Sequence, residues 1–164
     1  LLAAAEAYPA DPVTKLASRF LAVTAARSEA VRYAEWGEIE WERRQWRIPG
    51  AHMKGQRGQR NDPNFEFVIP LPDEGVAILE AVKLVTGNAK LIFGGIRDRN
   101  RPMSDATISA LYRRLPEFAG RRVPHGWRST FSTVMNEWAL EHGRPGDREV
   151  IDLMLAHVRG GVEG

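Results

Sequence analysis

The segment Pro124-His125-Gly126-Trp127-Arg128-Ser129-Thr130 combines an imidazole and a guanidinium at the start of a long helical pattern. His125 and Arg128 are three residues apart, so they lie on one face if both belong to a first helical turn. Pro124 favours a helix start at this point. The free amides and the dipole of a helix N-terminus attract anions. The segment therefore predicts a helix over about residues 126–140 that begins with a phosphate-binding pair.

Three other candidate residues lie far from this segment in the sequence. Arg27 ends the segment Thr24-Ala25-Ala26-Arg27, Lys54 follows a predicted hairpin, and His157 lies in Leu155-Ala156-His157-Val158. A single residue of this kind is more often a helix-terminal cation or a solvated side chain than a catalytic group. The informative feature is the order along the chain, which is Arg, Lys, His-x-x-Arg, His.

This order resembles the catalytic domain of the tyrosine recombinases, the phage integrase family, over about residues 16–164. The segment Arg101-Pro102-Met103-Ser104 adds to the similarity, which is greatest to integrases of prophages and genomic islands. The resemblance implies site-specific DNA recombination or integration, by strand cleavage and rejoining through a 3′-phosphotyrosyl intermediate. It also implies double-stranded DNA at attachment sites as the partner, and a tetramer of the full-length protein on that DNA.

The resemblance assigns a catalytic role to each of five residues. Arg27 and Arg128 would clamp the non-bridging phosphate oxygens, where bidentate donors stabilise the transition state. Lys54 would donate the proton to the leaving 5′-oxygen. His125 would assist proton transfer at the nucleophile or hydrogen-bond the phosphate, and His157 would donate a hydrogen bond to a phosphate oxygen.

One position departs from the family's pattern and leaves an alternative open. The family usually has an acidic residue three positions after the first arginine, and that position is Ala30 here, with Glu29 displaced by one. In the family this carboxylate supports the active site, so its absence is expected to impair activity unless Glu29 takes over that role. The alternative is therefore a degenerate integrase or a DNA-binding module that binds phosphate without turnover.

The nucleophile is the second departure. The resemblance places it about nine residues after His157, whereas the sequence ends seven residues after it. The three tyrosines, Tyr8, Tyr33 and Tyr112, match no family position, and Tyr112 is expected to pack within an apolar stripe. Residues 1–164 are thus expected to form a single catalytic domain truncated at both ends, without the N-terminal DNA-binding domains and the tyrosine segment. Such a fragment is expected to be inactive alone, because without the nucleophile it cannot cleave DNA and form the covalent intermediate.

Composition fits one globular domain that binds a polyanion. The 164 residues are 43% hydrophobic and 27% charged, which is ordinary for a domain that buries a core. The net charge is only +2, but four of the 23 basic residues are lysines and the other 19 are arginines, which suit bidentate phosphate contacts. The absence of cysteine excludes disulfides and cysteine-bound zinc.

No cofactor and no metal ion are expected. The four histidines and the carboxylates form no metal-binding spacing, and His52 and His142 match no family position and are expected at the surface. There is also no apolar run of membrane-spanning length and no secretory leader. A cytoplasmic protein without membrane contact is the resulting expectation.

The hydrophobic pattern predicts a mainly α (α+β) domain with a small three-stranded antiparallel sheet. A final helix marked by Val150, Leu153 and Met154 is expected with Asp147 as its cap, and Ser104 is the expected cap of an earlier helix. A helical interaction domain without a nucleic-acid partner is the remaining alternative. The other expected elements are helices at residues 1–7, 13–26, 28–36, around 78–85 and 108–115, strands at 39–41, 46–48 and 65–69, and a loop at 49–64.

Overall fold

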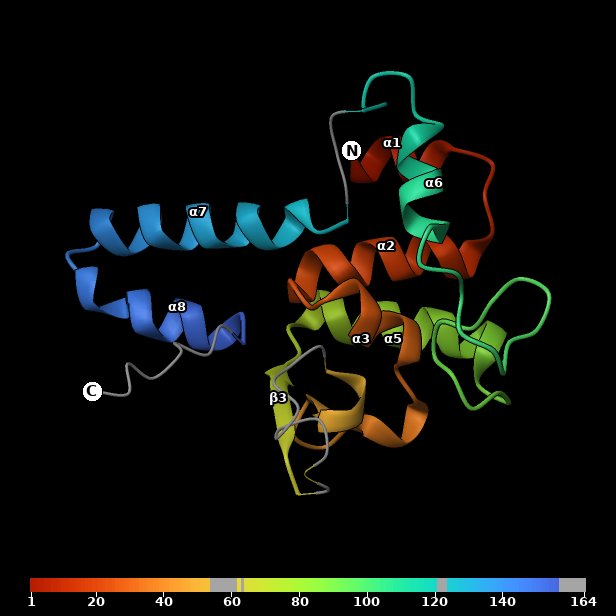
Figure 1. The fold of residues 1–164 in the computed structure, drawn as a ribbon, viewed down its shortest axis with the longest axis horizontal. Helices are drawn as coiled ribbons and strands as arrows, with labels where there is room; N and C mark the ends of the chain where they lie inside the picture. Colours follow the sequence, from red (N-terminus) through yellow and green to blue (C-terminus); the bar gives the residue numbers. More distant parts are fainter. Residues whose placement is uncertain (54–61, 63, 121–123, 157–164) are drawn as a thin grey trace.

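Helix α2 (Pro12–Thr24) runs through the middle of the molecule, and the sequence around it explains both of its ends (Figure 1). Asp11 caps the N-terminus, where its carboxylate accepts a hydrogen bond of 3.0 Å from the backbone N–H of Thr14. Pro12 occupies the first turn, in which a missing N–H costs nothing. The helix ends because Ala25 adopts a left-handed φ of 48°, which turns the chain towards Arg27.

The computed structural model describes residues 1–53, 62, 64–120 and 124–156. No helix in these ranges is long and apolar enough to cross a membrane. The remaining helices and strands, with the short 3-10 turns labelled η, are α1 (Leu2–Ala7), α3 (Ser28–Tyr33), η1 (Trp36–Glu38), β1 (Ile39–Glu40), β2 (Gln45–Pro49), η2 (Gly50–His52), β3 (Glu66–Pro70), α5 (Asp73–Thr86), α6 (Thr107–Arg113), α7 (Gly126–Glu141), η3 (Pro145–Asp147) and α8 (Arg148–Met154).

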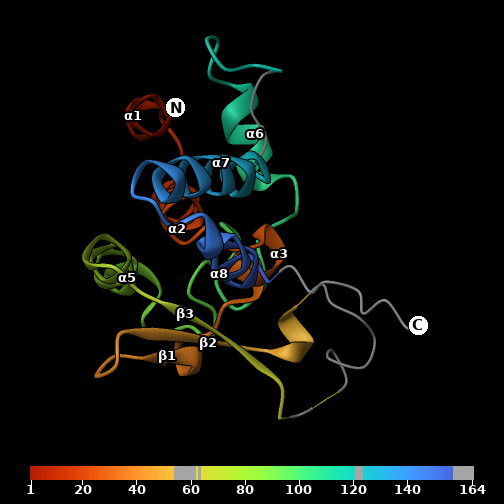
Figure 2. The ribbon, with the colours of Figure 1, turned by 90° about the vertical axis from the view of Figure 1, so that its left-hand side faces the viewer.

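The three strands form an antiparallel sheet in the order β1-β2-β3, which confirms the predicted hairpin and third strand. Trp46 pairs with Ile39 on one side and Ile69 on the other, and all three side chains are buried. Arg47, the next residue, makes ion pairs with Glu40 of β1 and Glu66 of β3 on the opposite face. The sheet therefore has one apolar face and one charged face. Helices lie along one side of the sheet in Figure 2, and the apolar face packs towards them through Phe20 and Trp46.

The main core joins the sheet to the helices through aromatic residues. Phe20 of α2 is fully buried, with its ring centroid 5.3 Å from that of Trp46 and 5.2 Å from that of Phe93. Ile78, Leu79 and Val82 of α5 and Leu111 of α6 are buried in the same cluster. We call this part, which comprises α1 to α6 and the sheet, the body.

Helices α7 and α8, joined by η3, lie side by side and extend away from the body, and we call them the arm (Figures 1 and 2). On α7 only Arg128 and Ala139 are buried. A second, small cluster holds the arm to the body, in which Ala25 packs with Ile151 and Leu155. The long predicted helix at residues 126–140 is thus confirmed, but it contributes little to the main core.

Two predicted helix boundaries are wrong for local reasons. The helix predicted at residues 28–36 ends at Tyr33, because the chain beyond it pairs with the segment after α5 through the backbone bonds Ile92 N–H to Ala34 O and Trp36 N–H to Lys90 O. Ser104 does not cap α6, which begins three residues later, at Thr107. Its hydroxyl instead lies 2.9 Å from that of Thr107.

The final helix is present, but its buried face differs from the prediction. Val150, Leu153 and Met154 are 54%, 70% and 45% exposed, whereas Ile151 and Leu155 are buried. Asp147 stands at the N-terminal cap position without a capping side-chain bond, because its carboxylate pairs with Arg144 at 2.9 Å. The apolar spacing located the helix but did not reveal which side faces the body.

Candidate phosphate-binding site

The turn between α2 and α3 sets the position of Arg27. After the left-handed residue Ala25, the backbone N–H of Ala26 bonds the hydroxyl of Thr24, and Arg27 takes up an extended conformation ahead of α3. The carbonyl of Arg27 accepts a bond from Val31, so the residue is anchored at the start of that helix. Its half-buried side chain reaches the end of α8, where Nη2 lies 3.4 Å from the carbonyl oxygen of Ala156.

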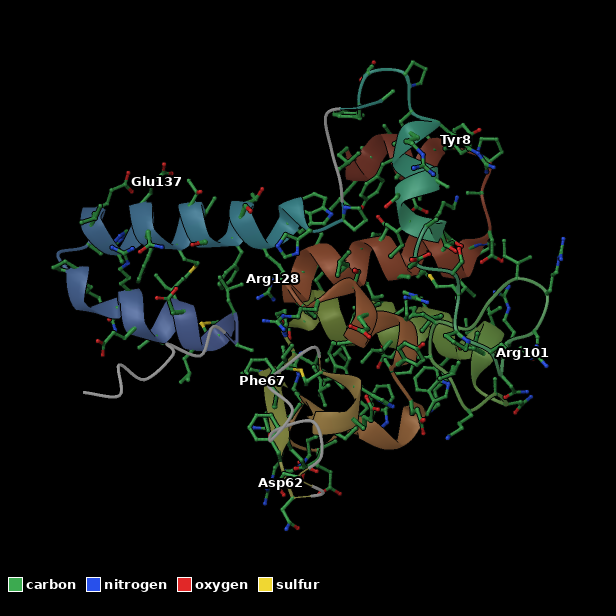
Figure 3. All side chains as sticks on the ribbon, in the orientation of Figure 1. Tyr8, Asp62, Phe67, Arg101, Arg128 and Glu137 are labelled. Atoms are coloured by element: carbon green, nitrogen blue, oxygen red, sulfur yellow. The ribbon has the colours of Figure 1, made fainter. Side chains whose placement is uncertain are left out.

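Arg128 comes to the same place from the first turn of α7, at the junction of arm and body (Figure 3). Its side chain is buried, with 5% of the residue exposed. Nη1 donates to the carbonyl oxygen of Ala25 at 2.9 Å, and Nη2 donates to the carbonyl oxygen of Leu155. The structure therefore brings Arg27 and Arg128 together between the α2–α3 turn and the end of α8.

The two guanidinium groups influence each other electrostatically. Burial, and secondly the charge of Arg27, lower the pKa of Arg128 to about 10. At neutral pH Arg128 is still protonated, so the site holds two adjacent positive charges. Such an arrangement is costly unless an anion offsets it.

The Nε of Arg128 is buried and has no hydrogen-bond partner within the part of the chain that the structure describes. Among these residues Arg128 also makes no ion pair, since both of its terminal nitrogens donate to neutral carbonyls. A buried donor without an acceptor costs about 1–3 kcal/mol, more in a charged group. Within the described ranges, Arg128 thus combines a charge without a counter-ion and a donor without an acceptor, and a phosphate oxygen would satisfy both.

The other three predicted site residues differ in what the structure says of them. His125 lies directly before α7, is exposed, and shares the helix start with Arg128, whose N–H donates to its carbonyl at 3.1 Å. Lys54 and His157 lie outside the described residues. No group of three or more potential metal-ligating residues occurs in the ranges that are described.

Comparison with known proteins identifies the family. The sequence profile of the phage integrase family matches residues 1–159. The chain belongs to the phage integrase family. It is 36% identical over 136 residues to prophage integrase IntA of Escherichia coli, and this match covers 83% of the chain and 29% of IntA. The chain thus spans less than a third of the length of that relative.

Solved structures of the same fold agree with this assignment. The XerA recombinase superposes with a TM-score of 0.69 at 20% identity, over 96% of this chain and 51% of that one. A lambda integrase dimer bound to a core site gives a TM-score of 0.66 at 18% identity, over 99% of this chain and 56% of that one. The fold is thus that of integrase and recombinase structures, as the sequence predicted.

The residue at the family's usual acidic position is Ala30, which is 2% exposed and packs in the main core. The neighbouring Glu29 is half-buried in the first turn of α3. A core alanine cannot supply a charge to the arginine pair. Whether Glu29 takes over that role stays a prediction.

Tyr112 is a packing residue, as predicted. It is fully buried, its hydroxyl lies 2.7 Å from that of Ser18, and it accepts a hydrogen bond of 2.9 Å from the indole of Trp127. Burial raises the pKa of Tyr112. The burial of its hydrogen-bonded hydroxyl and the raised pKa both argue against a nucleophilic role for Tyr112.

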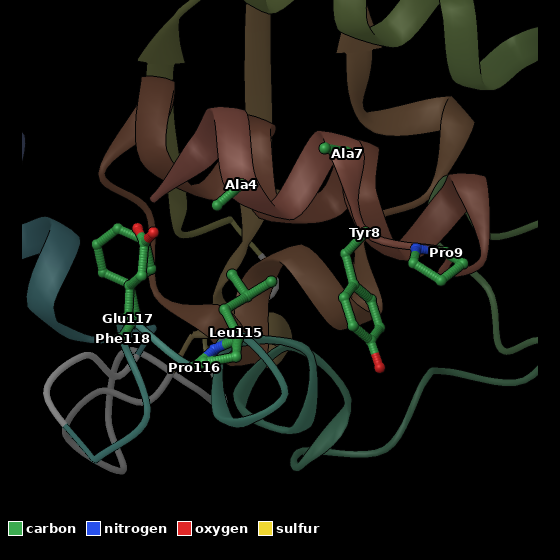
Figure 4. Close-up of a pocket in the computed structure, with 8 residues that line it drawn as sticks. All are labelled: Ala4, Ala7, Tyr8, Pro9, Leu115, Pro116, Glu117 and Phe118. Carbon is green, nitrogen blue, oxygen red and sulfur yellow. The ribbon is translucent and has the colours of Figure 1, made fainter.

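The other two tyrosines, Tyr8 and Tyr33, also make packing contacts. Tyr8 lines a hollow of about 390 Å³ between α1 and the segment after α6, together with Leu115 and Phe118 (Figure 4). It lies well away from Arg128 (Figure 3). The ring centroid of Tyr33 lies 5.9 Å from that of His52.

Of the two histidines expected at the surface, one prediction holds and one is wrong. His142 is exposed and stacks on Trp138. His52 is instead engaged in a pair, with Nδ1 2.7 Å from a carboxylate oxygen of Glu38 and only 21% of its side chain exposed. The sequence also gave no indication that backbone carbonyls at the α2–α3 turn and the end of α8 would hold the arginines, because backbone acceptors carry no residue signature.

Proposed function

We propose that residues 1–164 form the catalytic domain of a site-specific DNA recombinase, which cuts and rejoins strands through a 3′-phosphotyrosyl intermediate. The observation that carries this proposal is the pair Arg27 and Arg128, in which the buried Nε of Arg128, at the start of a helix, has no partner among the residues that the structure describes. Family membership supplies the reaction class. The proposed partner is double-stranded DNA at attachment sites, bound by a tetramer of the full-length protein in the cytoplasm.

The arginine pair would act on the phosphate during the transition state. Negative charge on the non-bridging oxygens increases as the nucleophile attacks, and two fixed guanidinium groups stabilise it without reorganisation. Arg128 keeps its terminal nitrogens on carbonyls, so Nε is the donor left for a phosphate oxygen. Arg27 would provide the second positive charge beside it.

The remaining candidate residues complete the proposed reaction. Lys54 would protonate the leaving 5′-oxygen during cleavage and accept the proton back during rejoining. His125, exposed beside Arg128, would assist proton transfer or bond the phosphate, and His157 would donate to a phosphate oxygen. The chemistry draws on protein groups alone, and no metal ion takes part in it.

The nucleophilic tyrosine of the proposed reaction comes from outside the 164 residues. Tyr112 is fully buried and hydrogen-bonded, Tyr8 lies well away from Arg128, and Tyr33 packs near His52. The chain alone should then be unable to form a covalent bond with DNA. It should still catalyse the rejoining half, in which the tyrosine is only a leaving group.

The experiment tests rejoining directly. A nicked duplex carries a 3′-p-nitrophenyl phosphodiester on one side of the nick and a 5′-hydroxyl on the other. The 5′-oxygen attacks phosphorus, the new P–O bond seals the strand, and p-nitrophenolate leaves in place of tyrosine. The chain in excess, at low ionic strength where phosphate contacts hold DNA of any sequence, is expected to accelerate sealing and release of the dye.

Arg128→Ala should reduce this rate by about 100–1000-fold, since it removes transition-state charge stabilisation. Arg101→Ala is the matched control, because Arg101 has 84% of its side chain exposed and pairs only with Asp98 among the described residues. Equal rates for both variants, or no acceleration by the unaltered chain, would overturn the proposal.

The degenerate-integrase alternative has Ala30 in its favour. It predicts that the chain binds the nicked duplex, measured by fluorescence anisotropy, and seals nothing. Restoring an acidic residue with Ala30→Asp would then be expected to leave sealing absent, because that position is buried in the core.

A further inference from the structure

Three polar side chains connect α2, α6 and α7 by hydrogen bonds next to the arginine site. The hydroxyl of Tyr112 in α6 lies 2.7 Å from that of Ser18 in α2, and it accepts a hydrogen bond of 2.9 Å from the indole N–H of Trp127 in α7. Ser18 and Tyr112 are fully buried, and the partly buried Trp127 packs against the main core. We call these three residues the polar link.

The polar link ends directly beside Arg128. Trp127 precedes Arg128 in the first turn of α7, so the bond that fixes its indole also limits how far the backbone of Arg128 can move. The guanidinium is held separately, because its terminal nitrogens donate to the carbonyl oxygens of Ala25 and Leu155. Nε is the guanidinium nitrogen nearest to the backbone. With the other two nitrogens anchored, the position of the backbone decides where Nε points.

The polar link and the guanidinium of Arg128 both attach the start of α7 to one helix of the body. Ser18 lies within α2, and Ala25 is the C-terminal cap of the same helix, seven residues further on. At about 1.5 Å per residue, the two points lie roughly 10 Å apart along the axis. Helix α7 begins beside α2 (Figures 1 and 2). Two attachments at this spacing fix both the position and the tilt of its first turn, whereas one would leave the tilt free.

Hydrogen bonds matter at this helix start because apolar packing contributes little there. On α7 only Arg128 and Ala139 are buried. Apolar contacts are non-directional, whereas a fully bonded polar network fixes one geometry. The hydroxyl of Tyr112 can serve both neighbours, since it can accept from an indole N–H and also bond a second hydroxyl. The polar link therefore supplies directional contacts where the helix has few apolar ones.

We propose that Ser18, Tyr112 and Trp127 are positioning residues for Arg128: they hold the start of α7 against α2 and so direct Nε of Arg128 towards the phosphate oxygen. This inference rests on the proposed function. A misplacement of about 1 Å can reduce a rate 100-fold. The polar link would thus contribute to the reaction through Arg128 alone, and it gives the hydroxyl of Tyr112 a role beyond packing.

The test compares the nicked duplex that carries a 3′-p-nitrophenyl phosphodiester with its two methylphosphonate analogues. In each analogue a neutral methyl group replaces one non-bridging oxygen, and the two diastereomers differ in which oxygen is replaced. In all three substrates the 5′-oxygen bonds to phosphorus, its proton passes to a base, and p-nitrophenolate leaves. A donor that faces one oxygen should matter little when a methyl group takes that position, because no charge develops there.

Arg128→Ala should slow sealing of the phosphodiester and of one diastereomer strongly, and the diastereomer that it slows least identifies the oxygen that Arg128 faces. Tyr112→Phe and Trp127→Phe should show the same pattern, with a loss of about 10–100-fold on the two sensitive substrates and less than about 3-fold on the other. Ser18→Ala should cost only about 3-fold on the sensitive substrates, because the bond between Trp127 and Tyr112 remains.

Trp36→Phe is the matched control. The indole of Trp36 is also partly buried and donates a hydrogen bond of 3.0 Å, but its acceptor is the carbonyl oxygen of Thr86 within the body. All three sealing rates should stay within about 2-fold of those of the unaltered chain, although a comparable hydrogen bond is lost. Thermal unfolding shows which variants are folded at the assay temperature, and Trp127→Phe remains the test if Tyr112→Phe does not fold.

The pattern across the three substrates decides the outcome. If Tyr112→Phe and Trp127→Phe slow all three equally, the polar link is merely structural and the inference is wrong. If they slow none, the inference is again wrong, while a selective loss in Arg128→Ala keeps the proposed function. If the unaltered chain seals no substrate, the proposed function fails and this inference falls with it.

Discussion

The body and the arm bury apolar surface in very different ways. The body has one continuous cluster, in which Phe20 touches both the sheet and the segment after α5. Among the described residues, the cluster that joins the arm to the body has three buried members, Ala25 from the body and Ile151 and Leu155 from the C-terminal part. Large apolar side chains of the arm, such as Leu140 at 67% and Leu153 at 70%, remain exposed.

This contrast shows what attaches the arm to the body. Its small apolar cluster is supplemented by Arg128, which donates one hydrogen bond to the body at Ala25 and one within the C-terminal part at Leu155. The candidate site is therefore built at the least well packed junction of the molecule. Arg128, which would bind phosphate, is also one of the residues that hold the two parts together, so its substitution should affect both function and the attachment of the arm.

The largest effect on stability is expected in the body. Phe20→Ala removes a fully buried ring that packs against Trp46 and Phe93, and should lower the free energy of unfolding by about 3–5 kcal/mol. Urea unfolding followed by tryptophan fluorescence measures the change. Leu84→Ala, at a residue that is 91% exposed, should change it by less than about 0.5 kcal/mol. A loss below about 1 kcal/mol for Phe20→Ala would contradict this account of the core.

The second effect should be confined to the arm. Ile151→Ala opens a gap in this small cluster and should cost about 2 kcal/mol, the low end for such a change, because the partly buried Phe131 and Met135 beside it can move into the gap. Hydrogen exchange should accelerate at amides of α7 and α8 and stay unchanged in α2. Leu153→Ala is the control, since that side chain is 70% exposed. Faster exchange throughout the body would show that arm and body unfold as one unit.

The elements could be predicted wherever apolar spacing and turn chemistry agree. Apolar spacing predicted α2 from residue 13, one residue after its observed start at Pro12, and alternation around the polar loop predicted the hairpin. Helix ends set by distant pairing could not be predicted, as at Tyr33, where the chain turns to meet the segment after α5. The buried face of α8 was also beyond prediction, because it depends on which side the body covers.

Only those parts of the site that consist of characteristic side chains could be predicted from the sequence. Arg27 and Arg128 were predictable from their motifs, and the structure brings them together. The carbonyls that orient them were not, since any residue has one. The pairing of Glu38 with His52, outside the site, was missed because it depends on how η1 and η2 meet in space.

A third and smaller effect tests the polar contact between body and arm. Tyr112→Phe removes the hydroxyl that links Ser18 of α2 to Trp127 of α7, and leaves the partly buried indole N–H without its acceptor. The free energy of unfolding should fall by about 1–2 kcal/mol. Urea unfolding measures it, and Tyr8→Phe serves as the control. No loss would mean that water or a shifted neighbour replaces the hydroxyl.

The smallest expected effect is a pH-dependent contribution to stability from Asp11, which lies in the body and has no counterpart in the arm's attachment through Arg128. Burial alone would raise the pKa of Asp11, but hydrogen bonds from Arg99 and Thr14 outweigh it and lower the pKa below 3.8. The ionised carboxylate therefore adds stability above pH 3.8, and this contribution is lost as the pH falls through the lower, folded-state pKa. Asp11→Asn keeps an acceptor for the cap but loses the charge that pairs with Arg99 at 2.6 Å.

Asp11→Asn should thus cost about 1 kcal/mol at neutral pH and almost nothing well below pH 3.8, where the wild-type carboxyl is protonated too. Urea unfolding at the two pH values gives both differences. The cost of Tyr112→Phe should be the same at both, because a phenol hydroxyl with a raised pKa stays neutral throughout. The hydrogen bonds by which Arg128 holds the arm should also be unaffected by low pH, because Arg128 remains charged and carbonyls do not titrate in this range. If Asp11→Asn lowers the free energy of unfolding equally at low pH, the loss comes from packing at the start of α2 and not from the charge that pairs with Arg99.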